Sequence, residues 1–275
     1  MNITMCHATS GRRRRIAVML TALLLACGLA AIASAQASPK SASVLKPRQV
    51  TQFQLFYVHP ADSKPVAGRS AGIQHIAMQA DTWLASEIGG GLSPRFVRGT
   101  DGRPSVLTIA SILSKSEITD REDIAFDAMP SYVARGVVKP RVLPIFFIEG
   151  EQDYDACAWY WDGRNGPYIS FPMDNCEIYP SVEDTFPDYA SYTLAHEIVH
   201  ALGAVGEDSP HEDGSGHVKG DPEDLMTGND WDDVDWERLT LDPGNDDYLR
   251  TGRRGLANIE RSPLLERASS TVWLS

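Results

Sequence analysis

The sequence has little positive charge for its length, and this deficit limits the partners that it can bind. Its 275 residues carry 25 Lys and Arg against 37 Asp and Glu, so the formal net charge is −12. Nucleic-acid binding requires basic side chains that neutralise phosphates, and we therefore expect no nucleic-acid partner. An acidic chain of this kind is typical of a soluble protein and favours the binding of cations.

Cysteine is also scarce, with four in the whole chain. Cys6 and Cys27 lie in an N-terminal segment that has the features of an export signal, and its removal leaves only Cys157 and Cys176. Exported proteins fold in an oxidising compartment, so we predict a single Cys157–Cys176 disulfide. The alternative is a pair of free, buried thiols.

Residues 1–37 resemble a secretory signal peptide. The basic run 12–15 precedes an apolar segment, 16–32, and residues 33–37 contain two A-x-A cleavage sites. A second interpretation is a lipoprotein signal that ends before Cys27, because Leu24-Leu25-Ala26-Cys27 resembles a lipobox. A transmembrane anchor is less favoured, since the apolar run is short of a full span. We expect an exported protein, either extracellular or in the periplasm or cell envelope, with membrane contact only if Cys27 is lipidated.

Beyond the signal, the sequence predicts a linker at 38–47 and one domain at 48–275, without internal repeats or long low-complexity tracts. Hydrophobic periodicity predicts strands at 52–59, 95–98, 105–112, 141–149 and 167–172, and helices at 71–88, 122–135 and 188–202. Pro144 places the fourth strand near an edge or a bulge. Periodicity fades after Gly203. These features predict an α+β fold with a mixed sheet, one helix that carries the site, and an irregular C-terminal part.

The stretch TLAHEIVHALGA, residues 193–204, contains the main functional motif. His196 and His200 are four residues apart, so both lie on one face of a helix. Two imidazoles in this arrangement can bind one Zn²⁺, and Glu197 lies close enough to act on a water at that ion. A carboxylate in this position can take a proton and later return it to a leaving amine. The alternative is a pair of core histidines bonded to carbonyls or carboxylates.

With Gly203, the motif reads H-E-x-x-H-x-x-G and resembles the metzincin family of zinc metalloproteases. Asp224-Leu225-Met226 is similar to the Met-turn of that family, with Met226 beneath the metal ligands. The order of HEIVHALGAV, SPH, GHV, DLM and LDPGNDDY also resembles a group of bacterial exported zincin-like proteins, over residues 189–248. The resemblance implies a zincin-like catalytic domain and a zinc-dependent hydrolase.

The sequence departs from this family at two positions. Gly206 stands where metzincins have a third histidine ligand, and Thr227 stands where the exported group often has a tyrosine. We therefore expect the third ligand to come from a longer loop. His217 is preferred and His211 is the alternative, with Asp221 or Asp224 as further candidates for a ligand or a supporting contact.

Two further features give weaker expectations. Tyr248 is a candidate for stabilising a transition-state oxyanion, although packing is the commoner role of a tyrosine. The acidic segment Asn229–Asp235 is a candidate Ca²⁺ site, with a solvated acidic face as the more ordinary interpretation.

The sequence as a whole predicts an exported zinc metalloendopeptidase whose partner is a peptide or protein substrate. His196, His200 and His217 bind zinc in this interpretation, and Glu197 is the general base. The alternative is a catalytically silent zinc-binding module of the cell envelope, and a third reading is hydrolysis of another amide there.

Overall fold

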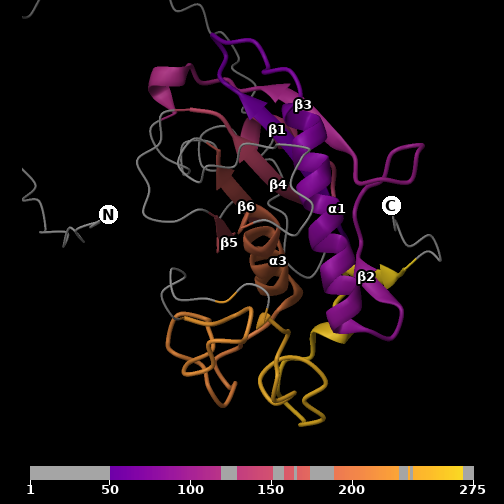
Figure 1. Cartoon of the computed structure of the whole chain (residues 1–275). Helices are drawn as coiled ribbons and strands as arrows, with labels where there is room; N and C mark the ends of the chain where they lie inside the picture. The colour runs from indigo at the N-terminus through magenta and orange to yellow at the C-terminus, as the bar shows by residue number, and fades with distance from the viewer. Residues whose placement is uncertain are drawn as a thin grey trace, which may run out of the picture. The chain divides into compact units, whose positions relative to one another are not determined.

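A five-stranded sheet forms the centre of the structure (Figure 1). The computed structural model describes residues 50–118, 129–150, 158–163, 166–173, 189–228, 235 and 238–268, which all lie in one compact unit, Ser41–Ser275. The strand order is β3-β1-β4-β6-β5. The strands are β1 (Gln52–His59), β3 (Val106–Ala110), β4 (Val142–Ile148), β5 (Trp159–Gly163) and β6 (Gly166–Pro172). Neighbouring strands are parallel except for β5, which runs antiparallel to β6, so the predicted mixed sheet is confirmed.

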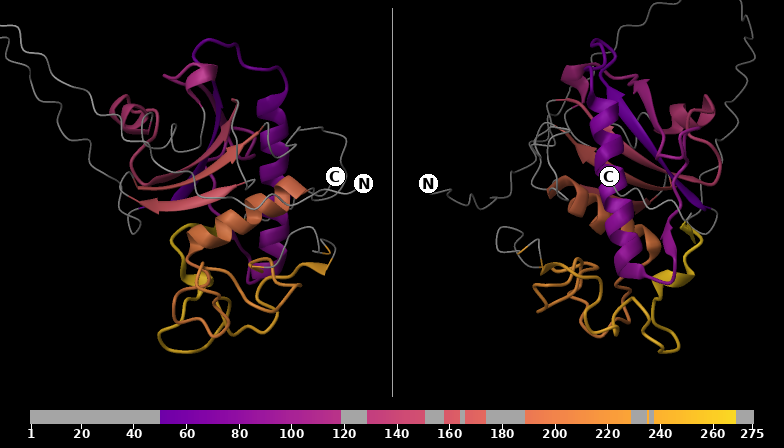
Figure 2. Two further views of the ribbon diagram at one scale, coloured as in Figure 1. Left: turned by 90° about the vertical axis from the view of Figure 1, so that its left-hand side faces the viewer. Right: turned by 45° about the vertical axis from the view of Figure 1, so that its right-hand side comes forward.

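Helices cover both faces of this sheet (Figure 2). Helices α1 (Arg69–Ile88) and α3 (Tyr189–Leu202) share one hydrophobic cluster with strand residues such as Leu55 and Ile145. The next residues along each strand, Phe56 and Phe146, belong to a second cluster with α2 (Met129–Ala134). Alternate side chains of a strand point to opposite faces, which explains why every residue of β4 is buried. Among the described helices, none has the length and hydropathy to cross a membrane.

A second, two-stranded sheet ties the C-terminal part of the chain to the region after α1. Here β2 (Leu92–Pro94) pairs antiparallel with β7 (Leu265–Arg267). Arg98 strengthens this connection because its guanidinium donates to Asp81 of α1 at 3.0 Å and to Glu266 of β7 at 3.4 Å. Between α3 and β7, the described residues form turns, isolated bridges and one short 3-10 helix, Ile259–Arg261. The predicted irregular C-terminal part is therefore confirmed.

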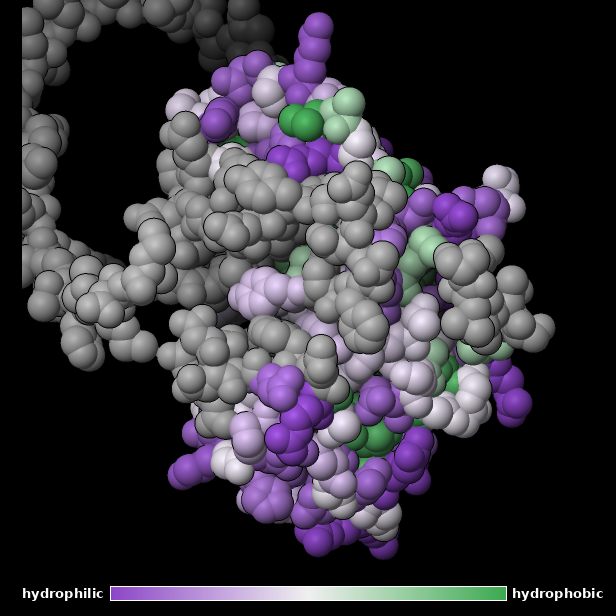
Figure 3. All heavy atoms as spheres, viewed as in Figure 1, coloured by the Kyte–Doolittle hydropathy of each residue, from purple (hydrophilic) through white to green (hydrophobic). Residues whose placement is uncertain are grey.

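The space-filling view agrees with a loop region that keeps its apolar side chains inside. At the lower end of Figure 3, where the C-terminal loops lie, most visible described residues are hydrophilic. Leu225, Met226 and Tyr248 of this region are buried completely. The buried residues of the loops therefore extend the hydrophobic cluster that α1 and α3 form with the sheet.

Two expectations about the strands were wrong, and one strand was not predicted. The segment 95–98 makes isolated bridges, and the strand lies just before it at β2. Pro144 stands in the central strand β4, which is possible because the pairing of β4 with β6 starts only at Ile145. Strand β5 was not expected at all. The predicted disulfide cysteines, the first half of the helix predicted at 122–135, the signal at 1–37 and most of the candidate calcium segment lie outside the described residues.

Candidate metal centre

Helix α3 presents the HExxH motif from a nearly fully buried position. Leu194, Ala195, Ile198 and Val199 have no solvent exposure, so they fix the helix between α1 and the sheet. A helix that is apolar on most of its circumference leaves one stripe for its polar side chains. Gly203 ends the helix with φ of 95°, a conformation that favours glycine, and the chain turns there toward the C-terminal loops.

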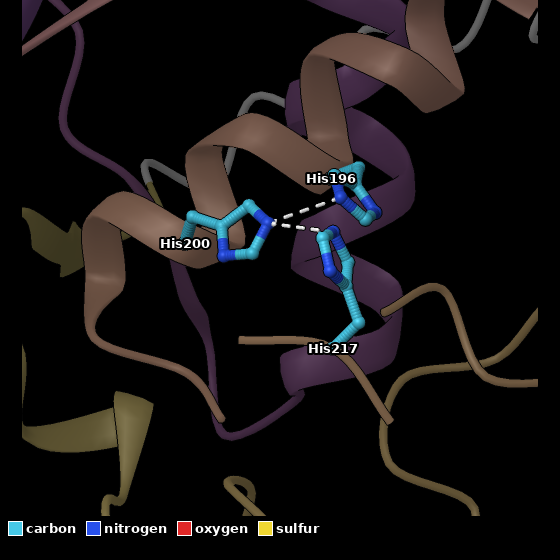
Figure 4. A group of neighbouring side chains, drawn as sticks. All are labelled: His196, His200 and His217. Atoms are coloured by element: carbon cyan, nitrogen blue, oxygen red, sulfur yellow. Dashed lines mark hydrogen bonds between the residues drawn. The ribbon is translucent and has the colours of Figure 1, made fainter. Parts of the chain in front are cut away.

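The side chains of His196, His200 and His217 meet at one point (Figure 4). The Nε2 atom of His200 lies 3.1 Å from that of His196 and 3.3 Å from that of His217. Two nitrogen ligands of a tetrahedral ion such as zinc lie about 3.3 Å apart when each bond is about 2.05 Å. Both distances from His200 therefore match ligands of one metal ion, and ligand atoms of all three histidines lie within 4.8 Å of one another.

The hydrogen-bond partners of two of the rings indicate their tautomers. The carbonyl of Leu225 accepts a bond from Nδ1 of His196 at 2.8 Å, so the neutral His196 ring has its proton on Nδ1. Nδ1 of His217 donates to the Ser215 hydroxyl at 2.9 Å, because that hydroxyl gives its own proton to Asp213 at 2.7 Å. Both rings then direct an Nε2 lone pair at His200, whose single Nε2 proton can serve only one of them. With the His200 proton on Nδ1 instead, all three Nε2 atoms present a lone pair, and such a donor set fits a metal ion.

The electrostatics of the cluster favour the neutral imidazoles that a metal requires. Burial lowers the pKa of His196 from 6.5 to about 3. Burial, together with the neighbouring imidazoles, lowers the pKa of His200 to about 2. Burial also lowers the pKa of His217. All three rings are therefore uncharged at neutral pH.

The loop that carries His217 is fixed by hydrogen bonds to two carboxylates. Oδ1 of Asp213 accepts hydrogen bonds from the backbone and the hydroxyl of Ser215, both at 2.7 Å, and from the backbone of His217 at 3.3 Å. Glu212 similarly accepts from the backbone of Gly214 and Gly216. Asp213 and Ser215 were not among the site residues predicted from the sequence. The alternation Asp-Gly-Ser-Gly-His was a usable signal, because it leads from a carboxylate to an imidazole through a small hydroxyl.

Glu197 follows His196 on α3 and is also buried, with 7% of its surface exposed. Tyr160 of β5 borders the site on the sheet side, since its ring stacks on that of His200 at a centroid distance of 6.4 Å. Desolvation raises the pKa of Tyr160, so the phenol stays protonated. The sequence analysis did not single out Tyr160, because β5 was not expected.

The predicted Met-turn lies directly beside the histidines. Residues 224–227 form a turn in which the Thr227 amide donates to the Asp224 carbonyl at 3.0 Å. Met226 is fully buried, and the Leu225 carbonyl is the acceptor for His196. The turn therefore contacts the helix motif through its backbone as well as its side chains.

The remaining candidates have other hydrogen-bond partners. His211 has an exposed ring that bonds Asp247 at 2.9 Å, and it clusters with Asp246 and Asp247 instead. Asp221 accepts from the backbone of Glu223 at 3.0 Å. The Tyr248 hydroxyl donates to Asp224 at 2.6 Å and accepts from the Asp242 amide at 3.0 Å, so both of these bonds go to protein groups.

Comparisons with known proteins add little to this geometry. No family model and no curated protein matches the chain. Two crystal forms of wild-type OgpA from Akkermansia muciniphila are similar at 13% and 11% identity, with TM-scores of 0.45 and 0.38. They cover 73% and 58% of this chain, which spans 60% and 49% of theirs. Catalytically inactive OgpA in complex with an O-glycopeptide, glycodrosocin, has 11% identity and a TM-score of 0.39, and covers 58% of this chain and 49% of its own. These identities and TM-scores are too low to support an inference about function. That inference therefore rests on the geometry of the three histidines.

Proposed function

We propose that this chain is an exported zinc-dependent endopeptidase. The observation that carries the proposal is the convergence of three neutral Nε2 atoms, from His196, His200 and His217, at the spacing of ligands to one tetrahedral ion. Three protein ligands leave a fourth position for water or substrate, which is typical of catalytic zinc sites and not of structural ones. Export remains an expectation from the signal-like residues 1–37.

The residues around the site have distinct parts in the proposed reaction. Zinc, when bound, supplies Lewis-acid chemistry that lowers the pKa of a water to about 7 and polarises a carbonyl. Glu197 accepts a proton from the attacking water and then delivers it to the leaving amine. The Leu225 carbonyl and the Ser215 hydroxyl hold two of the imidazoles in the tautomer with the proton on Nδ1 and a lone pair on Nε2.

Cleavage of a mixed peptide library by the zinc-loaded chain tests this function. The parent and the control Glu207→Gln, which changes an exposed acid after α3, should cleave peptides. Glu197→Gln should bind one zinc per chain and leave the library intact, because an amide cannot accept the proton.

The silent binding module is the second candidate. Gly206 and Thr227 depart from the family pattern, and the Tyr248 hydroxyl already has two protein partners, so these observations favour it. One zinc per chain with no cleavage by the parent would support this module or a non-peptide amide substrate.

A further inference from the structure

The turn 224–227 connects two of the three histidines. Its Leu225 carbonyl accepts from Nδ1 of His196 at 2.8 Å. Its Met226 carbonyl accepts from the backbone amide of Val218 at 2.7 Å, directly after His217. Val218 in turn accepts from the amide of Gly228 at 3.0 Å. A displacement of this turn would therefore move His196 and His217 relative to each other.

Asp224 and Tyr248 fix this turn through hydrogen bonds. Oδ1 of Asp224 accepts from the Met226 amide at 2.7 Å and from the Tyr248 hydroxyl at 2.6 Å. Asp224 and Tyr248 are 1% and 0% exposed, so water cannot replace either bond if it is lost. The amide of Leu225 has a separate partner in the Thr240 carbonyl at 2.9 Å.

Tyr248 is itself fixed by Asp242. The Asp242 amide donates to the Tyr248 hydroxyl, and its carboxylate accepts four backbone amides, from residues 246–249, at 2.5–3.3 Å. Asp242 is also buried and has φ of 49°, which closes the loop around its carboxylate. The phenol is therefore a rigid link between this closed loop and the turn.

We propose that Tyr248 and Asp224 are positioning residues, which hold the Leu225–Met226 turn against His196 and His217 and thereby set the zinc affinity of the site. The inference rests on zinc binding in the proposed function and deepens it. Contacts that orient metal-binding histidines typically change metal affinity by about 10–100-fold when they are removed. The bonds from Met226 and Tyr248 both go to one oxygen of Asp224, so the pair acts through geometry and requires an acceptor and not a charge.

Zinc affinity of the full chain, measured by competition with a chelator, tests the pair. Tyr248→Phe and Asp224→Ala should weaken zinc binding about 10–100-fold. Asp224→Asn should bind zinc nearly as tightly as the parent, because its amide oxygen can accept both bonds. Tyr132→Phe is the matched control and should keep the zinc affinity of the parent. Tyr132 is also a buried tyrosine, but it belongs to the second hydrophobic cluster, which includes none of the three histidines.

A second measurement reports the tautomer of His196. In the zinc-free parent, nitrogen NMR of the imidazoles should show the His196 proton on Nδ1, and Tyr248→Phe should introduce the other tautomer. If Tyr248→Phe does not fold, Asp224→Ala decides in its place.

Several results would overturn the inference. These are unchanged affinity in Tyr248→Phe, an equal loss in Tyr132→Phe, an equal loss in Asp224→Asn and Asp224→Ala, or an Nε2 proton on His196 in the zinc-free parent. A parent that binds no zinc would overturn the proposed function as well, whereas tight binding in the parent and in all variants would overturn this inference alone.

Discussion

Replacing Asp224 with asparagine should remove the contribution of this one buried acid to the pH dependence of stability. Burial is the main cause that raises the pKa of Asp224 from 3.8 to about 7, and its bonds from Tyr248 and Met226 offset this only in part. An acid whose pKa is higher in the folded state gives stability that is complete below the unfolded value and is lost as pH rises through the folded value. For Asp224 this loss falls between about pH 4 and pH 7.

The magnitude follows from the two pKa values. A shift from 3.8 to about 7 makes protonation of Asp224 contribute about 3 kcal/mol more to stability at pH 5 than at pH 8. This is a large fraction of the total stability of a domain, which is about 5–15 kcal/mol. Asparagine mimics the protonated acid, because Oδ1 keeps both hydrogen bonds and the amide nitrogen takes the place of the protonated oxygen.

Guanidinium unfolding of parent and Asp224→Asn at pH 5 and pH 8 measures this effect. A chelator keeps both proteins zinc-free, because a ligand of the folded state would add its own stabilisation. The stability of the variant relative to the parent should rise by about 3 kcal/mol from pH 5 to pH 8. An equal difference at both pH values would refute the reasoning, since Asp224 would then have an ordinary acidity despite its burial.

Other predictions concern the loop and the helix. Ser215→Ala should weaken zinc binding about 10–100-fold in chelator competition, since His217 loses its acceptor, and unchanged affinity would contradict this role. Gly203→Ala should destabilise the chain by more than about 1 kcal/mol in guanidinium unfolding because its φ is 95°, and an unchanged midpoint would count against a strained turn. Leu194→Ala should cost about 2–5 kcal/mol, whereas the exposed Val66→Ala should change stability by less than about 0.5 kcal/mol.

The helical half of the site follows from the sequence because its geometry is local. A spacing of four residues places His196 and His200 on one face of any helix, whatever surrounds it. The apolar residues between them predict a buried helix, and Gly203 marks its end. These features depend on neighbouring residues only, so they could be read before any tertiary contact was known.

The loop half of the site could not be predicted in the same way. His211 and His217 follow α3 in a region without periodicity, and only the hydrogen bonds made by Asp213 and Asp247 determine where each ring points. Burial of Tyr248 depends on a loop that closes around Asp242, which no sequence period indicates. The same limit applies to β5, because its short aromatic run becomes a strand through pairing with β6.

Zinc content of two histidine variants tests the central claim most directly. His217→Ala and His211→Ala remove the same side chain from two positions of one loop region, and only His217 lies with His196 and His200. After zinc loading and removal of loosely bound metal, His211→Ala should retain one zinc per chain and His217→Ala should retain none. Retention of zinc by His217→Ala, with its loss from His211→Ala, would contradict the account.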